Sequence, residues 1–220
     1  MKLKTLLILP VVLFITNQSV AQFSIGIKSG ISNAWEYYGD VDLPEGAEID
    51  VNGYYFSVLG YYDLSKNLSI GIEPGFVQRG AACVPGWSPF IGDTEFNLNY
   101  IETPVFLRGN IGFLKDRISV FGKVGFGGSY LQHGVEIEES QFPEIPDNET
   151  VIDFEGKFKT LSRYDYGAYG GAGIAVHFGA TQLFIEGNYY HALKNFDSEN
   201  ISQNRSLQLG LGVSRNFGSL

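Results

Sequence analysis

Apolar and polar residues alternate one by one along most of the chain after residue 22, the period that is typical of β-strands. The clearest stretch runs from Tyr164 to Tyr190, where two alternating segments flank the tight turn Gly179-Ala180-Thr181 and predict an antiparallel hairpin. The same period predicts eight strands in all: Phe23–Trp35, Gly53–Asp63, Leu68–Ala81, Phe96–Ile111, Ile118–Leu131, Tyr164–Phe178, Gln182–Tyr190 and Arg205–Phe217.

The connections between these strands alternate between long and short. Long loops are expected at residues 36–52, 82–95, 132–163 and 191–204, and short turns at residues 64–67, 112–117 and 179–181. An even number of strands, with long loops at one end and tight turns at the other, is typical of a transmembrane β-barrel. In the longest loop Val135–Glu138 and Val151–Phe158 still alternate, which makes them candidates to extend the fifth and sixth strands beyond a membrane.

The face opposite the apolar one decides between a membrane barrel and a soluble barrel of the lipocalin type. A soluble barrel would expose this face to water and carry many Lys and Glu residues on it. Here it holds mostly glycine and serine with about one charge per strand, which suits the narrow, filled interior of an eight-stranded barrel and leaves no room for a large pore. The charges expected to point inward and pair there are Lys28, Asp63, Glu73, Arg79, Glu102, Arg108, Lys123, Asp165 and Glu186.

Aromatic residues on the apolar face collect at both ends of the strands. Two such girdles are expected where amphipathic rings meet lipid headgroups. Near the long loops lie Trp35, Tyr54, Tyr130, Tyr164, Tyr166 and Tyr189, and near the short turns lie Phe23, Tyr62, Phe178 and Phe217. The apolar face is therefore predicted to contact lipid.

The first residues have the features of a secretory signal peptide. Lys2 and Lys4 precede the apolar run Leu6–Ile15, which is too short to span a bilayer as a helix, and the small-residue site Ser19-Val20-Ala21 follows. We expect a signal peptide at residues 1–21 and one barrel domain at residues 22–220. Export and a barrel together predict the outer membrane of a Gram-negative cell, with the short turns in the periplasm and the long loops outside.

Charge and cysteine content exclude several other classes. Without Lys2 and Lys4, 13 of the 15 Lys and Arg residues remain against 24 Asp and Glu, a net charge of −11. Nucleic acid is therefore not an expected partner. Cys83 is the single cysteine, so neither an internal disulfide nor a cysteine-based metal site is expected, and the role of this thiol stays open.

Two sequence segments resemble a known family. The segment Asn99-Tyr100-Ile101-Glu102-Thr103-Pro104-Val105-Phe106-Leu107 and the closing segment Leu207–Ser214, together with the leader, are similar to the PorT-like outer-membrane β-barrel family of Bacteroidetes. The resemblance implies a small eight-stranded barrel and, because the namesake belongs to a protein-secretion system, a component of a secretion or transport assembly. One departure is the end Phe217-Gly218-Ser219-Leu220, since such barrels tend to end on an aromatic residue.

The sequence carries no motif of an enzyme. Ser129 lies near His133 and Ser198 near His191, but no nucleophile elbow or metal-binding histidine spacing accompanies them, and His177 is expected to point inward. Among the acidic loops, a weak calcium-site candidate is the group Asp40, Asp42, Glu45 and Asp50, although solvated charge is the better explanation. No enzyme activity, metal or cofactor is expected.

These observations predict a structural or interaction protein of the cell envelope, and a secretion component is the alternative. Expected partners are outer-membrane lipid and lipopolysaccharide, with a protein or surface polymer bound through the acidic loops. The barrel is expected to be a monomer, because a closed ring leaves no strand edge to pair.

Overall fold

The computed structural model describes residues 23–37, 48–83, 94–138, 146–154, 159–197 and 202–218. Within these ranges the chain forms eleven strands, and every pair of neighbours is antiparallel. The strands are β1 (Phe23–Tyr37), β2 (Glu48–Ile49), β3 (Val51–Ser65), β4 (Leu68–Ile72), β5 (Gly75–Cys83), β6 (Thr94–Phe113), β7 (Ile118–Glu138), β8 (Asn148–Val151), β9 (Tyr164–Phe178), β10 (Thr181–Ala192) and β11 (Gln203–Phe217).

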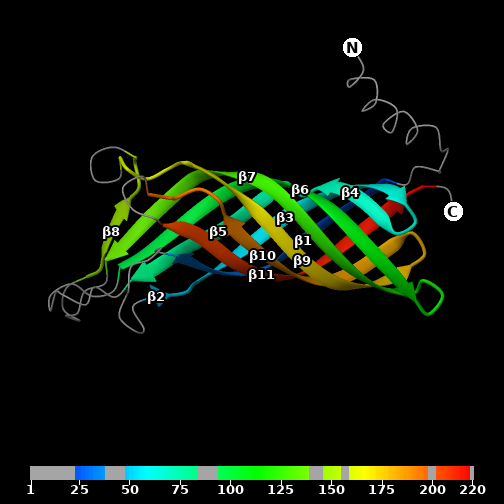
Figure 1. Cartoon of the computed structure of the whole chain (residues 1–220). Helices are drawn as coiled ribbons and strands as arrows, with labels where there is room; N and C mark the ends of the chain where they lie inside the picture. Colours follow the sequence, from blue (N-terminus) through cyan, green and yellow to red (C-terminus); the bar gives the residue numbers. More distant parts are fainter. Residues whose placement is uncertain are drawn as a thin grey trace, which may run out of the picture.

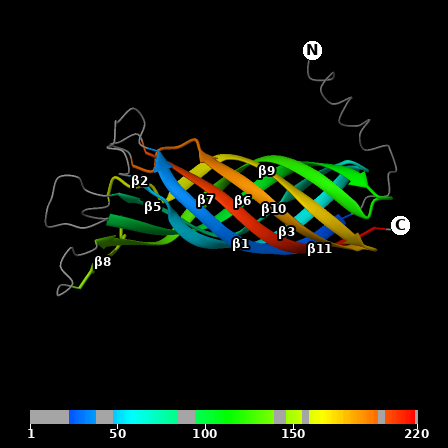
Figure 2. The ribbon, with the colours of Figure 1, turned by 90° about the horizontal axis from the view of Figure 1, so that it is seen from below.

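The strands close into a ring that has eight positions. β1 pairs with β11 from Phe23↔Phe217 to Tyr37↔Gln203, which joins the first strand to the last. β4 and β5 share one position between β3 and β6, while the short strands β2 and β8 are added beyond β5 and β7. Figures 1 and 2 show the tilted strands wrapping around one axis, with the described ends of the chain at the short-turn end. The expected eight-stranded antiparallel barrel is confirmed.

Two prolines explain why the third position of the ring is divided into β4 and β5. Glu73 and Pro74 interrupt the strand, and they lie opposite Thr103 and Pro104 of β6, because Ile72 pairs with Val105 and Gly75 with Glu102. A proline cannot donate a backbone hydrogen bond to a neighbouring strand. Placing both prolines at one break in the ladder limits the loss, and the Glu73 amide still donates to the Pro104 carbonyl at 3.0 Å.

At the long-loop end, the predicted extension of the fifth strand is present, and the predicted extension of the sixth strand is wrong. β7 continues through Val135 to Glu138. Val151 does not extend the sixth strand, because it belongs to β8, which pairs with β7 through Val135↔Val151, and β9 begins only at Tyr164. Alternation marks a segment as extended but does not specify its partner. Residues 155–158 of this predicted extension lie outside the described residues.

The outward face of the barrel is apolar, and the inward face carries the polar groups. Along β11, Leu209 and Leu211 are 51% and 66% exposed, whereas Gln208 and Gly210 between and beside them are buried. Both predicted aromatic girdles point outward: Tyr54, Tyr130, Tyr164, Tyr166 and Tyr189 at one end, and Phe23, Tyr62, Phe178 and Phe217 at the other, with Trp35 half-buried. Apolar surface of this extent is what a lipid-facing band requires.

The interior differs from the expectation that glycine and serine fill most of it. Large rings occupy the lumen as well: Tyr55, Tyr61, Tyr100, Phe106, Phe121, Tyr169, Phe184 and Tyr190 are all buried. The inward glycines make room for these rings. A Cβ atom at Gly71 would lie 2.3 Å from the Tyr61 ring, and one at Gly212 would lie 2.1 Å from the Phe184 ring. Small and large residues therefore alternate across the lumen and fill it.

The turn between β9 and β10 has two residues, Gly179 and Ala180, because Phe178 pairs directly with Thr181. Gly179 has a φ of 62°, a conformation that glycine adopts without steric cost and that two-residue hairpins commonly need. Along the described ranges, the structure contains no helix with the length and apolar character needed to cross a membrane.

Candidate functional site in the barrel interior

Of the nine charged residues predicted to point inward, eight are buried inside the ring, and none of these eight is more than 6% exposed. They come from six ring positions: Lys28, Glu73, Arg79, Glu102, Arg108, Lys123, Asp165 and Glu186. Asp63, on the same face of β3, is half-buried near the short-turn end. The structure divides these residues into two ion-pair clusters, and Arg108 and Asp165 belong to neither.

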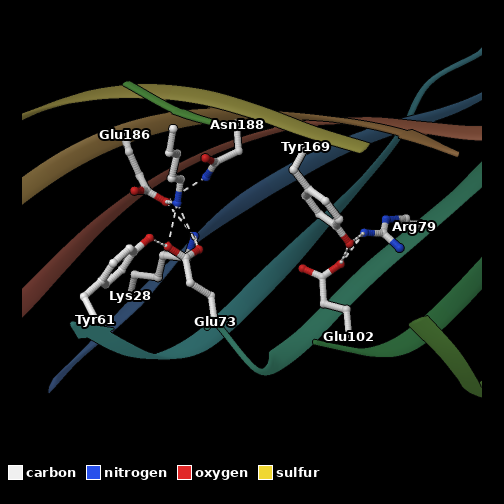
Figure 3. Close-up of polar contacts among 9 residues, drawn as sticks. Lys28, Tyr61, Glu73, Arg79, Glu102, Tyr169, Glu186 and Asn188 are labelled. Atoms are coloured by element: carbon white, nitrogen blue, oxygen red, sulfur yellow. Dashed lines mark hydrogen bonds and ion pairs between the residues drawn. The ribbon is translucent and has the colours of Figure 1, made fainter. Parts of the chain in front are cut away.

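The central cluster contains two lysines and two glutamates. Lys28 Nζ lies 2.6 Å from Glu73 Oε2 and 2.5 Å from Glu186 Oε1. From the opposite side Lys123 Nζ contacts both Glu73 oxygens at 2.8 and 2.9 Å, and Glu186 Oε1 at 3.0 Å. Figure 3 shows Lys28, Glu73 and Glu186 converging from different parts of the ring. The two cations and two carboxylates balance in charge, which is the condition for burying them together.

Two neutral side chains complete the central cluster. The Tyr61 hydroxyl donates to Glu73 Oε1, and Asn188 Nδ2 donates to Glu186 Oε1 at 2.7 Å. Each carboxylate therefore accepts hydrogen bonds from both lysines and from one neutral donor. Hydrogen bonds to both carboxylates of this kind rigidify a buried network. The cluster joins β1, the β4–β5 position, β7 and β10 across the lumen.

A second cluster lies nearer the long loops and centres on Arg79. Its guanidinium pairs with Glu102, donates to Ser129 Oγ at 3.2 Å, and stacks 3.9 Å from the centre of the Tyr190 ring. Tyr169 donates its hydroxyl to Glu102 Oε2 at 2.9 Å, as Figure 3 shows. Asp165 is held separately, by Asn204 Nδ2 at 3.1 Å.

An apolar cluster closes the lumen beyond Arg79. Strand residues Tyr55, Val77, Leu98, Tyr100 and Leu131 pack there against Ile152 and Phe196, which come from the segments between the long strands. Phe96, Phe154 and Leu161 pack against the same cluster. We refer to these ten residues as the outer cap. Together with the two ion-pair clusters, the cap fills the lumen from its middle to the long-loop end.

At the short-turn end, by contrast, the lumen holds a cavity of about 550 Å³. Arg108, Asp63 and His177 line it. Ser119 Oγ lies 2.8 Å from His177 Nε2, a contact of the kind that activates a nucleophile. Among the described residues, however, no side chain bonds the other ring nitrogen, so the pair lacks the orienting third group of a catalytic triad.

The remaining candidate positions are less informative. Asp40, Asp42 and Glu45 of the calcium candidate lie outside the described residues, and Asp50 is exposed. Among the residues that the structure does describe, no group of three His, Cys, Asp or Glu side chains could hold a metal ion. His133 and His191 lie in β7 and β10, and the position of Cys83 at the end of β5 reveals no role for it.

The sequence did not identify the neutral partners of the charges. Tyr61 and Tyr169 each donate to a buried carboxylate, and Ser119 contacts His177. The signal available for Tyr61 was its alternation with the outward Tyr62, which places it on the inner face. Choosing its partner among the inward carboxylates requires the strand register, because Glu73 lies in a different strand.

Comparisons with known proteins agree with this architecture. The family model described as "Outer membrane protein beta-barrel domain" matches residues 17–198. A major outer membrane protein from Thermus thermophilus superposes with a TM-score of 0.52 at 14% identity, covering 90% of this chain and 99% of that one. OprG from Pseudomonas aeruginosa superposes with a TM-score of 0.50 at 8% identity, covering 89% and 96%. A comparison with curated proteins gives no match.

These similarities confirm the all-β barrel. The family model also confirms the outer-membrane location that the sequence predicts. Because the sequence identities are low, the solved structures support the fold and do not identify a ligand or partner. The PorT-like subgroup in particular is not what these comparisons identify.

Proposed function

Because the chain belongs to the family of outer membrane protein β-barrel domains, whose model matches residues 17–198, we propose that it is a non-conducting outer-membrane anchor. Its binding activity would lie in the rim, the part of the barrel at the long-loop end that extends beyond the membrane. The observation that carries this proposal is the filled lumen.

In the part of the chain that the structure describes, side chains occupy the lumen from its middle to the long-loop end. The central cluster bridges opposite walls through Lys28 and Lys123, and the Arg79 cluster and the outer cap lie beyond it. Breaking the paired charges to open a path would leave uncompensated charge inside the barrel. A filled eight-stranded barrel is also what the strand number predicts.

Electrical recordings test the non-conducting anchor directly. The purified full-length protein, reconstituted in planar lipid bilayers, should give no stable single-channel steps at physiological salt. A variant with Lys28→Ala, Lys123→Ala, Glu73→Ala and Glu186→Ala removes the central cluster and serves as the comparison, with folding checked by circular dichroism. Stable steps from the wild-type protein would contradict the proposal.

The rim is formed mainly by the outer parts of β6 and β7 together with β8. Beyond the girdle residue Tyr130, β7 continues to Glu138, roughly 25 Å of strand at the usual rise per residue. β8 pairs with this extension from Val135↔Val151 to Glu138↔Asn148. Asp147 and Glu149 are exposed there, so the extension presents acidic groups away from the membrane. A partner with cationic groups would fit this rim.

The rim is tested by charge removal. A variant with Asp147→Asn and Glu149→Gln should lose crosslinks to its envelope partner when intact cells are treated with a crosslinker. Asp116→Asn, which removes an exposed acid at the opposite end of the barrel, is the matched control and should keep them. Equal crosslinking by both variants would contradict a role for the acidic rim.

A second candidate is a component of a secretion assembly, which the resemblance of Asn99–Leu107 to the PorT-like family favours. The structure gives two conspicuous residues of this segment local roles, however: Glu102 pairs with Arg79, and Pro104 lies at the break between β4 and β5. The segment therefore has a structural explanation without secretion. Depletion of the protein should trap secreted cargo in the periplasm if this candidate holds, and normal secretion would exclude it.

We also propose that residues 1–21 are removed on export, that residues 22–220 act as one monomeric barrel domain, and that the protein is not an enzyme. Ring closure through β1 and β11 supports the monomer, since it leaves no long strand edge to pair with a second chain. Mass spectrometry of the protein extracted from outer membranes tests the first two points, because it gives both the mature mass and the oligomeric state.

A further inference from the structure

The cavity at the short-turn end opens away from the outer cap. Residues of all three short turns line it, among them Asn67, Asp116 and Gly179, so its mouth lies where the turns end. Tyr61 lines its inner end, and the hydroxyl of this residue donates to Glu73 of the central cluster. The cavity is therefore a vestibule that extends from the short turns to the central cluster. Its volume of about 550 Å³ lies within the range of small-molecule binding sites.

Arg108 is the residue of this vestibule that is best suited to bind a ligand. Its side chain is buried, at 6% exposure, and its guanidinium lies 3.8 Å from the centre of the Phe121 ring. Nε donates to Asn110 Oδ1 at 3.0 Å. Among the described residues no carboxylate forms an ion pair with Arg108, whereas Lys28, Lys123 and Arg79 are each paired. A buried guanidinium with free donors is suited to bind an oxyanion through two parallel hydrogen bonds.

Asp63 provides an opposite charge in the same vestibule. It lies two ring positions from Arg108, because Arg108 pairs with Ser69 and Ser69 pairs with Asp63, and Asn216 hydrogen-bonds its carboxylate. Near the mouth Lys66 and Asp116 neutralise each other at 3.2 Å. The interior of the vestibule therefore has one cation and one anion, two ring positions apart.

Neutral hydrogen-bonding groups on β7, β9, β10 and β11 line the rest of the vestibule wall. Ser119 and His177 form one pair, and Gln182 Nε2 donates to Ser214 Oγ at 2.7 Å in another. These groups can contact polar atoms of a ligand, while the Asp63 carboxylate repels a molecule that carries only negative charge.

We propose that this vestibule binds a small zwitterion, a molecule with a carboxylate or phosphate group for Arg108 and an ammonium group for Asp63. The ligand enters from the short-turn end, which faces the periplasm in barrels of this plan. The site is separate from the acidic rim, and it does not depend on a partner being bound there.

The test uses the full-length protein in phosphatidylcholine nanodiscs and three matched probes. Phosphoethanolamine carries both charges, methyl phosphate only the anion, and ethanolamine only the cation. The reporters are the Arg108 Nε–H signal and the His177 ring signals in NMR spectra. Phosphoethanolamine should shift both residues saturably, at a concentration at least tenfold below that required for methyl phosphate, and ethanolamine should leave Arg108 unchanged. Equal affinities for the first two probes, or no saturable shift, would overturn the proposal.

Three variants and one control variant separate a binding role from a structural one, with His177 as the reporter. Arg108→Gln should weaken phosphoethanolamine binding at least tenfold, and Arg108→Lys, which keeps the buried charge and hence the fold, should weaken it through loss of the second hydrogen bond. Asp63→Asn should abolish the preference over methyl phosphate. Arg215→Gln removes an exposed arginine on β11 outside the vestibule and should bind as the wild type does. Wild-type binding by both Arg108 variants would overturn the assignment.

A final experiment distinguishes a lipid headgroup from a free solute as the ligand, since both can contain the same zwitterionic group. In nanodiscs that contain phosphatidylethanolamine, an Arg108 signal already shifted before any probe is added would identify the headgroup as the ligand. An unshifted signal that still responds to phosphoethanolamine would identify a free solute, and either result supports the site.

Discussion

Replacing Glu73 by glutamine is expected to destabilise the barrel by about 3–5 kcal/mol, the range for breaking a buried ion pair by removing one partner. The Glu73 carboxylate accepts hydrogen bonds from Lys28 at 2.6 Å and from Lys123 at 2.8 and 2.9 Å, in addition to the one from Tyr61. Glutamine keeps the size of the side chain but removes its charge. Glu186 would then be left to neutralise two buried lysines alone.

The assay is urea unfolding in phospholipid vesicles, followed by the fluorescence of Trp35 in a Trp87→Phe background. Trp35 lies in the outer girdle, so its emission should change when β1 leaves the membrane. Lys66→Met is the matched control, because it breaks the Lys66–Asp116 pair, whose side chains are 81% and 63% exposed. Exposed pairs contribute about 0–1 kcal/mol, so this variant should unfold nearly as the wild type does.

A double variant tests whether the effect comes from charge. Adding Lys123→Met to Glu73→Gln restores the balance between Lys28 and Glu186, so the double variant should be more stable than the sum of the two single changes implies. A loss for Glu73→Gln no larger than that for Lys66→Met would refute the argument. So would simple additivity of the two substitutions, because the cluster would then not act as a unit.

Three further substitutions test the lipid-facing surface, the packing of the lumen and the turn by the same unfolding assay. Leu211→Arg places a charge halfway along β11 and should cost about 2–4 kcal/mol, against about 0–1 kcal/mol for Phe217→Arg at the girdle. Gly210→Ala puts a Cβ atom 2.5 Å from a backbone oxygen and should cost about 1–3 kcal/mol, whereas Gly122→Ala, with its nearest atom at 3.9 Å, should be nearly neutral. Gly179→Ala should cost about 1 kcal/mol, because φ there is 62°. Equal losses of stability for Leu211→Arg and Phe217→Arg would contradict the lipid-facing position of Leu211. Equal losses for Gly210→Ala and Gly122→Ala would contradict the close packing at Gly210, and no loss for Gly179→Ala would contradict the turn geometry.

The strand pattern could be predicted from the sequence because each strand has one lipid-facing side and one lumen-facing side. Alternation along β9 and β10 assigned Ile174 and Leu183 to the outside and Asp165 and Glu186 to the inside, as the structure has them. This inference needs no knowledge of neighbouring strands. It is local, and a period of two is sufficient for it.

Side-chain contacts that depend on the register between strands could not be predicted from alternation. That Glu73 lies between Lys28 and Lys123 follows from the closure of the ring and its tilt, which bring residues distant in sequence together. Similarly, β8 looked like the start of the next strand because its alternation carries no information about its partner. That Arg108 has no ion-pair partner among the described residues was hidden for the same reason, since its sequence context resembles that of Arg79.

If the protein is an outer-membrane barrel, its apolar face contacts lipid and its polar face is enclosed. Spin labels at single cysteines along β11, placed in a Cys83→Ser background in lipid nanodiscs, test it directly. Power saturation should show high oxygen accessibility and little contact with a water-soluble nickel complex at residues 207, 209, 211 and 213. At residues 208 and 210, oxygen accessibility should be low. High nickel accessibility along the outward positions would contradict the account, because these residues would then face water.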